Sequence, residues 1–143
     1  MIKIDNLKER LNKTTLPVVE NVYTGGYSFN VVYSENNGKR IAFSKALSAK
    51  LALEDEIELF PIPDENVLVV SKNLPDNRSI KCKLSGKDKK IGYNSSAVKL
   101  IIDSFNLNFD SSTSKSFSNI KIDELDGVSI AQIEIREKNL VTK

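Results

Sequence analysis

The chain has no histidine, no tryptophan and only one cysteine among its 143 residues. Without histidine it can build neither a His-based catalytic triad nor a His-ligated zinc site, and it lacks the commonest general acid–base group. A lone cysteine forms no internal disulfide, so the fold does not depend on an oxidising compartment. We therefore expect a protein that is not an enzyme and that carries no cofactor or metal.

Long apolar runs are also lacking. None approaches the roughly 18 residues that a membrane helix needs, and no charged start is followed by an apolar stretch and a cleavage site. We expect a soluble, cytoplasmic protein that does not bind a membrane. With 40% hydrophobic residues the chain can bury one core but not two separate ones, so residues 1–143 are expected to form a single domain.

One pattern occurs twice: an alternating strand, a Gly-Lys turn, a second strand, a short helix and a hairpin. The first repeat spans residues 27–71 and the second spans residues 78–135. Residues 1–26 precede both, and are predicted to form an amphipathic helix over 3–13 and an extended lead-in. Because neither half has enough apolar surface to stand alone, we expect both to share one core about a pseudo-two-fold axis.

The predicted fold class is mainly β with short helices (α+β), in two tandem ββαββ halves. Ser44 caps a predicted helix that ends at Leu51, and Asn94 caps one that ends at Phe105. Ser111–Ser116 is predicted to be a mobile polar loop. The predicted strands lie near 27–33, 40–43, 57–60 and 67–70 in the first half, and near 79–84, 90–93, 117–122 and 128–135 in the second.

A formal net charge of +2 conceals an uneven distribution. Between Lys72 and Lys99 there are eight Lys or Arg against two Asp, a local balance of +6. The segment Glu54–Glu65 holds six acids and no base. The sequence therefore predicts a polarised molecule with a cationic and an anionic region.

The stretch Gly38–Leu53, with the sequence GKRIAFSKALSAKLAL, is followed by two short strand-like segments, Glu54–Leu59 and Val67–Val70. This basic strand, short helix, acidic turn and pair of closing strands resembles the AbrB-like swapped-hairpin family, which includes bacterial transition-state regulators and antitoxins. Ser44 departs from the proline that usually opens the family's helix, and Ala52 from the glycine that usually closes it. The resemblance covers residues 38–70, and the second half follows the plan by topology only. It implies two swapped-hairpin-like halves in one chain.

Members of that family usually bind DNA as dimers through basic residues of their paired hairpins. The resemblance therefore implies a non-enzymatic, DNA-binding transcription regulator that binds duplex DNA through a basic hairpin face, as a monomeric pseudo-dimer or a homodimer. Basic residues of the two halves would then meet across the pseudo-axis. The candidate contact residues are Lys39, Arg40, Lys81, Lys83, Lys87, Lys89 and Lys90.

Two other interpretations stay open. The lysines at 81–90 are equally typical of a solvated edge strand that lysine protects from aggregation. The acidic segment 54–65 suits a small protein-binding module or inhibitor, from a phage or other mobile element, that acts on a basic host protein. Single-strand binding is less favoured, because Tyr93 is the one aromatic residue close to the basic cluster.

Two further motifs are interpreted as structural. Cys82 is flanked by two lysines, but strand alternation points it away from them, together with Ile80 and Leu84, so a buried cysteine is expected rather than a nucleophile. Ser96–Lys99 matches the Ser-x-x-Lys spelling of penicillin-recognising enzymes. The companion motifs of that class are absent, so the match is interpreted as chance.

Overall fold

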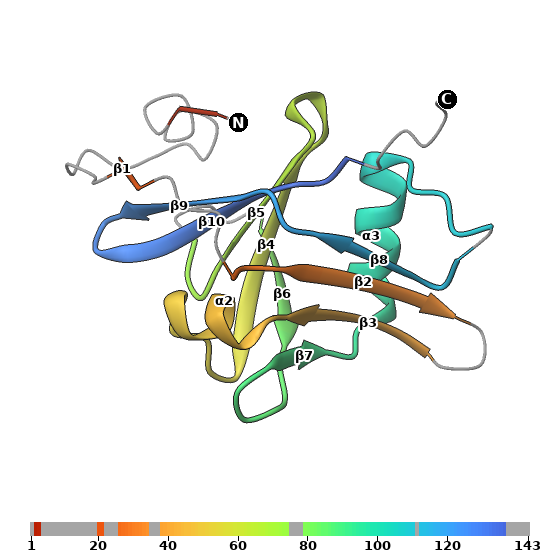
Figure 1. Cartoon of the computed structure of the whole chain (residues 1–143), viewed down its shortest axis with the longest axis horizontal. Coiled ribbons are helices and arrows are strands. Elements are labelled where there is room, and N and C mark those ends of the chain that lie inside the picture. The colour runs from red at the N-terminus through yellow and green to blue at the C-terminus, as the bar shows by residue number, and fades with distance from the viewer. Residues whose placement is uncertain are drawn as a thin grey trace.

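The structure, a computed structural model, describes residues 2–3, 20–21, 26–34, 38–74, 79–110 and 112–136. Apart from Lys3, the helix predicted over 3–13 lies outside the described residues, and so does the tail 137–143. The described residues form two antiparallel sheets and few, short helices (Figure 1). The predicted class, mainly β with short helices, is confirmed.

The larger sheet, which we call sheet A, has the strand order β1-β9-β10-β5-β4-β6. Its centre consists of two hairpins, β4–β5 and β9–β10, which meet where β10 pairs with β5. β6 lies beside β4, and β1 lies beside β9. The bounds are Glu20–Asn21 (β1), Glu56–Ile62 (β4), Val67–Ser71 (β5), Ile80–Lys83 (β6), Ile120–Leu125 (β9) and Val128–Glu134 (β10).

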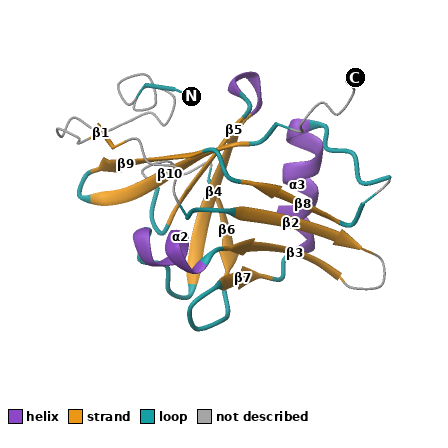
Figure 2. Ribbon diagram, viewed as in Figure 1, coloured by secondary structure: helices purple, strands orange, loops and turns teal. Residues whose placement is uncertain are grey.

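The smaller sheet, sheet B, has the strand order β7-β3-β2-β8. In Figure 2, α2 lies near the left ends of β2 and β3, and α3 lies near their right ends. A short 3-10 helix, η1, joins β4 to β5. The bounds are Phe29–Ser34 (β2), Gly38–Phe43 (β3), Lys90–Gly92 (β7), Ser114–Phe117 (β8), Lys45–Lys50 (α2), Ser95–Phe105 (α3) and Pro63–Glu65 (η1).

The two sheets are joined at two corners. Ser118 and Asn119 lead directly from β8 in sheet B to β9 in sheet A, and the N–H of Glu134 donates to the carbonyl of Asn119 at 3.0 Å. At the other corner Ser85, just after β6, exchanges both backbone hydrogen bonds with Ile91 of β7, at 2.8 and 2.9 Å. The sheets therefore enclose one interior.

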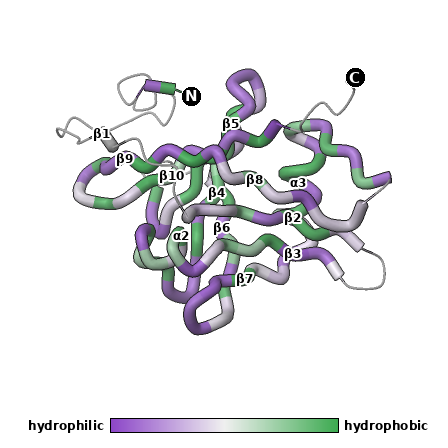
Figure 3. The backbone as a smooth tube through the Cα atoms, viewed as in Figure 1, coloured by the Kyte–Doolittle hydropathy of each residue, from purple (hydrophilic) through white to green (hydrophobic). Residues whose placement is uncertain are grey.

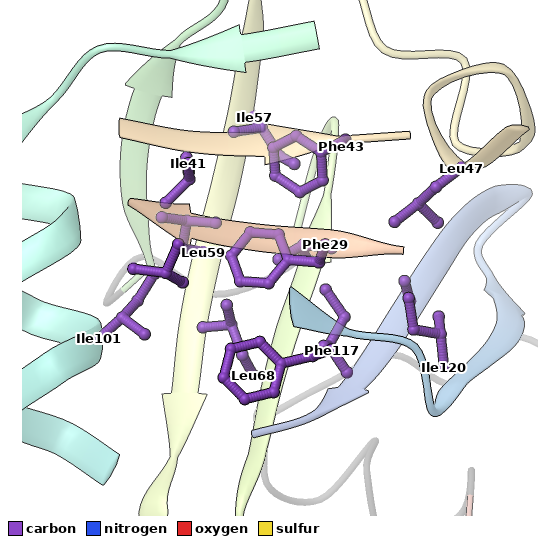
Figure 4. Packing of buried hydrophobic residues seen from close by; sticks show 14 of the residues in the cluster. Phe29, Ile41, Phe43, Leu47, Ile57, Leu59, Leu68, Ile101, Phe117 and Ile120 are labelled. Atoms are coloured by element: carbon purple, nitrogen blue, oxygen red, sulfur yellow. The ribbon is translucent and has the colours of Figure 1, made fainter. Parts of the chain in front are cut away.

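The main core fills the space between the sheets. Apolar side chains from β2, β3, β4, β5, α2, α3 and β8 point toward one another there (Figure 4). Among them are three tilted rings, with Phe29 centred 5.1 Å from Phe43 and 6.4 Å from Phe117. Figure 3 shows hydrophilic residues at the β4–β5 and β6–β7 turns, away from this core. Burial of alternate strand residues is thus the main stabilising contribution to sheet B.

A second apolar cluster covers the other face of sheet A. Because consecutive side chains of a strand point to opposite faces, Leu68 and Val70 enter the main core while Val67 and Val69 enter this second cluster. β5 is therefore buried on both faces, which explains its unbroken run of apolar residues. The second cluster contains Ile2, Ile62, Val67, Val69, Leu74, Leu125 and Ile130.

Both helices begin as predicted. The Ser44 hydroxyl accepts from the N–H of Leu47 at 3.2 Å, and the Asn94 carbonyl oxygen accepts from the N–H of Ala97 at 2.9 Å. These bonds satisfy N–H groups that the first helical turn leaves without a partner. The starts of α2 and α3 are therefore determined locally.

Both helices also end in a similar way. Ala52 after α2 and Asn106 after α3 adopt the left-handed conformation, with φ of 52° each. A buried leucine follows, and its N–H returns to the helix: Leu53 donates to Ser48 and Leu107 donates to Ile102. At the end of α2 the N–H of Ala52 also donates to the carbonyl of Ala49, which completes the Schellman motif. At the end of α3 the N–H of Asn106 donates to the carbonyl of Ile102, as in the αL motif. Both arrangements satisfy the last carbonyl groups of the helix.

The polar loop predicted over Ser111–Ser116 is wrong in its second half. Ser114, Lys115 and Ser116 belong to β8, which pairs with β2 from Phe29↔Phe117 to Val32↔Ser114. The serine-rich composition suggested a loop because it offers little to bury. The ladder with β2 and the buried ring of Phe117 supply the stabilisation that composition alone does not reveal.

Several strand pairs join the two predicted repeats. Within the first repeat β2 pairs with β3 and β4 with β5, and within the second β9 pairs with β10. Four further ladders connect the repeats: β2 with β8, β3 with β7, β4 with β6 and β5 with β10. The halves are therefore interleaved rather than side by side.

No helix in the described part of the chain is long and apolar enough to cross a membrane.

Candidate functional site

Charged residues divide between the two sheets. The strands of sheet B hold Lys39, Arg40, Lys90 and Lys115 and contain no Asp or Glu. In the strands of sheet A other than β1, acids outnumber lysines by five to three. These are Glu56, Glu58, Asp123, Glu124 and Glu134 against Lys81, Lys83 and Lys121.

Lys81 and Lys83 do not join the cationic sheet. They lie on β6 at the edge of sheet A, where Lys81 is directly opposite Glu58 and Lys83 is directly opposite Glu56. Opposite charges at paired positions attract and reduce the field that either would present to a polyanion. The charges of these two predicted contact residues are therefore offset by the glutamates of the neighbouring strand.

Lys39 and Lys115 belong to a cation–aromatic cluster formed with Tyr33 and Phe109. The Lys39 ammonium lies 5.3 Å from the centre of the Tyr33 ring, and the Lys115 ammonium lies 5.2 Å from that of Phe109. The two rings are 5.7 Å apart. Attraction between a cation and the face of an aromatic ring favours this position of each ammonium. The sequence does not indicate Lys115, because the serine-rich segment Ser111–Ser116 predicts a loop. It places Tyr33 on a strand, but gives neither Tyr33 nor Phe109 a role in the site.

Arg40 follows Lys39 on β3 and points to the other face of sheet B. Its partner across the ladder is Val32, whereas the buried Ile41 points into the main core. Arg40 is half-buried. Sheet B therefore carries cations on both of its faces at the end where β3 begins.

Lys87, Lys89 and Lys90 form a second cationic group in the β6–β7 turn. Lys87 and Lys89 are exposed, while the Lys90 ammonium donates to the carbonyl of Gly86 at 2.9 Å. The N–H of Lys90 also donates to the hydroxyl of Ser48 at 3.2 Å, which ties the turn to α2. The turn thus presents its lysines from a fixed position.

The two cationic groups lie at opposite ends of β3. Lys90 is paired with Phe43, the last residue of β3, whereas Lys39 is four residues earlier. At about 3.3 Å per residue these positions are roughly 13 Å apart. The structure therefore separates Lys39 and Arg40 from the turn lysines, although the resemblance implied that they would meet.

The acidic segment does not form one surface. Glu54, Asp55 and Glu56 lie at the start of β4, where Lys72 and Lys83 join them around an open depression of about 620 Å³. Asp64 and Glu65 lie beyond the far end of β4, in η1. Six residues of β4, positions 57–62, separate the two groups, or roughly 20 Å.

Cys82 is buried, as predicted, and Leu84 shares its burial. Ile80, predicted to face the same way, is 36% exposed because it begins the edge strand β6. Burial raises the pKa of the Cys82 thiol, and a hydrogen bond with Asn94 lowers it by less. A thiol kept protonated is a poor nucleophile. Among the described residues, no group of three or more Cys, Asp or Glu side chains is placed to hold a metal ion.

Comparison with known proteins identifies no relative. No family model, no curated protein and no solved structure matches this chain.

Proposed function

We propose that this protein is a non-enzymatic regulator that binds duplex DNA through the cationic residues of sheet B and the β6–β7 turn. The observation that carries the proposal is the division of charge: the strands of sheet B hold four cations and no carboxylate. An excess of positive charge attracts a polyanion, although Asp88 lies between Lys87 and Lys89 in the turn. Each phosphate that the protein neutralises releases a condensed counterion. The contact residues are Lys39, Arg40, Lys87, Lys89, Lys90 and Lys115.

The cation–aromatic cluster favours duplex over single-stranded DNA. A single strand is bound by stacking its bases on open ring faces. Here Lys39 lies over the ring of Tyr33, which is 39% exposed, and Lys115 lies over the ring of the half-buried Phe109. The cluster therefore places two ammonium groups over the ring faces on which bases would stack.

We also propose that the two halves are swapped-hairpin-like units related by a pseudo-two-fold axis. The ladders support this, because exchanging β2, β3, α2, β4 and β5 with β6, β7, α3, β8–β9 and β10 leaves the pairings between these elements unchanged. The pairing of β1 with β9 has no counterpart among the described residues. The matching helix starts and ends agree with it. The residues correspond less well: Phe43 before the first helix is 1% exposed, while Tyr93 before the second is 68% exposed.

A salt titration tests DNA binding. Affinity for a labelled random-sequence duplex is measured from low to high salt for the native chain and for the variant Lys39→Gln, Arg40→Gln, Lys115→Gln. If each residue meets one phosphate, the slope of log affinity against log salt shrinks by about 0.9 per contact, or about 2.7 in all. The matched control, Lys81→Gln, Lys83→Gln, Lys99→Gln, removes the same charge from residues opposed by Glu58, Glu56 and Asp103, and keeps the native slope.

If the slope of log affinity against log salt is equal for both variants, sheet B does not contact the DNA. Absence of duplex binding even at low salt would refute the function. A pull-down dominated by one protein would then favour the protein-binding module, although the division of its acids between the two ends of β4 gives that alternative less support.

A further inference from the structure

Two side chains of sheet A form hydrogen bonds with the main chain of Ile2. The N–H of Ile2 donates to Oε1 of Gln132 at 3.1 Å, and the carbonyl of Ile2 accepts from Nε2 of the same glutamine at 2.9 Å. The ammonium of Lys121 donates to that carbonyl at 3.3 Å. A single glutamine thus pairs with both polar groups of one residue, as a neighbouring strand would.

The glutamine is held in the orientation that this pairing needs. Its Nε2 also donates to Oδ2 of Asp123 at 3.2 Å, and a carboxylate oxygen accepts but does not donate. The ammonium of Lys121 lies 4.0 Å from the same oxygen. Gln132 is fully buried and Asp123 nearly so. The three side chains therefore form a rigid polar receptor beneath Ile2.

The side chain of Ile2 is an apolar anchor. It is buried in the second apolar cluster, with residues from β4, β5, β9 and β10 on the outer face of sheet A. Lys3, the next residue, is exposed. The contacts thus recognise one residue by its backbone N–H and carbonyl and by a β-branched side chain.

We propose that this receptor is a peptide-binding site, and that Ile2 is its intramolecular occupant. None of the contacts depends on the covalent link between Ile2 and the rest of the chain. An extended segment of a partner protein with a β-branched apolar residue can make the same three hydrogen bonds and fill the same cluster. Removing Ile2 leaves the buried Gln132 amide without its two main-chain hydrogen bonds, which is costly, so the vacated site favours a replacement.

The experiment uses the full chain with Ile2→Asp, because a carboxylate is expelled from an apolar cluster. The probe is a labelled peptide copying residues 1–6, and binding is followed by fluorescence anisotropy. We expect 1:1 binding to the variant that is at least tenfold tighter than binding to the native chain, where Ile2 competes. Lys3→Asp is the matched control: it places the same charge one residue away, leaves Ile2 seated and binds the peptide no better than the native chain.

Two further measurements complete the test. Adding Gln132→Met to the Ile2→Asp chain removes both main-chain hydrogen bonds at similar volume, and weakens peptide binding at least tenfold. A peptide with aspartate in place of isoleucine at its second position binds equally weakly. Thermal unfolding confirms that each variant is folded.

Three outcomes would overturn the proposal. Failure of Ile2→Asp to fold would make Ile2 an integral part of the core. If Ile2→Asp folds but does not bind the peptide, the site does not accept a peptide in place of Ile2. Concentration-dependent dimers of the native chain that Ile2→Asp abolishes would assign the site to the N-terminus of a second copy. The duplex titration is independent, because the receptor lies on sheet A.

Discussion

The sulfur of Cys82 lies against Gly92, in a space that accepts no additional carbon atom. A Cβ built on Gly92 would lie 2.7 Å from Sγ of Cys82 and 3.2 Å from Cγ1 of Ile41. The absence of a side chain at position 92 is therefore what allows β7 to close over Cys82. The same closure removes the thiol from water and raises its pKa.

We predict that Cys82 reacts slowly with an aromatic disulfide reagent in the folded protein and rapidly in urea. Because its folded-state pKa is raised, the native chain keeps the thiol proton at a pH where the unfolded chain releases it. The contribution of Cys82 to stability is therefore full below the ordinary thiol pKa of about 8.5, and falls as pH rises above it. Urea unfolding at pH 7 and pH 9.5 measures this loss.

Cys82→Ala is the control for that measurement, since it removes the titrating group and should remove this part of the pH dependence. Rapid labelling of the native protein would contradict the burial of the strand face on which Cys82 lies.

At the scale of one element, α2 ends with a residue that is poorly suited to its conformation. Ala52 has a φ of 52°, which costs an L-residue roughly 1–2 kcal/mol. In the AbrB-like family, which residues 38–70 resemble, this position is usually glycine. The Leu53 to Ser48 and Ala52 to Ala49 hydrogen bonds nevertheless hold the left-handed turn in place.

We predict that Ala52→Gly raises the free energy of unfolding by about 1 kcal/mol, because glycine adopts positive φ without a Cβ clash. Ala52 is exposed, so the substitution removes no buried contact. Ala49→Gly, at an exposed position inside α2, is the matched control and should lower stability by about 0.5–1 kcal/mol. Urea denaturation of both variants measures the difference, and a destabilising Ala52→Gly would contradict the observed turn.

At the scale of the whole molecule, neither half can complete its sheets alone. Sheet B takes β2 and β3 from the first half and β7 and β8 from the second, and the two central hairpins of sheet A come from different halves. The main core likewise combines Leu47 of α2 with Ile101 of α3 (Figure 4). Stability therefore depends on pairing between segments that are far apart in the sequence.

We predict that fragments 1–77 and 78–143 are each unfolded and that mixing them restores β structure. Each fragment alone lacks the partner strands of four ladders and half of the core. Far-UV circular dichroism of the separate and mixed fragments is the measurement. A fragment that folds cooperatively by itself would show that the interleaved ladders are not needed for stability.

Patterns a few residues long predicted much of the local structure correctly. The period of two placed β2 and β3, and Ser44 and Asn94 marked the starts of both helices, since caps and alternation act between near neighbours. The sequence does not predict a strand at Ser114–Ser116, because that strand is stabilised by β2, more than 80 residues earlier in the sequence. The single strand predicted over 117–122 is divided in the structure, where Phe117 ends β8 and Ile120 begins β9. The sequence also placed Lys81 and Lys83 in the candidate site, because it does not show that the pairing of β6 with β4 sets a glutamate opposite each of them.

The amino-acid sequence by itself determined the class of the fold, the helix ends and which residues are charged, because these depend on neighbours within a few positions. Only the tertiary structure decided which charges share a surface. It placed Lys39 and Lys115 over the neighbouring rings of Tyr33 and Phe109. It also placed the two lysines of β6 opposite two glutamates of β4. The reason is physical: charges act through space, and the ladders between the halves set those distances.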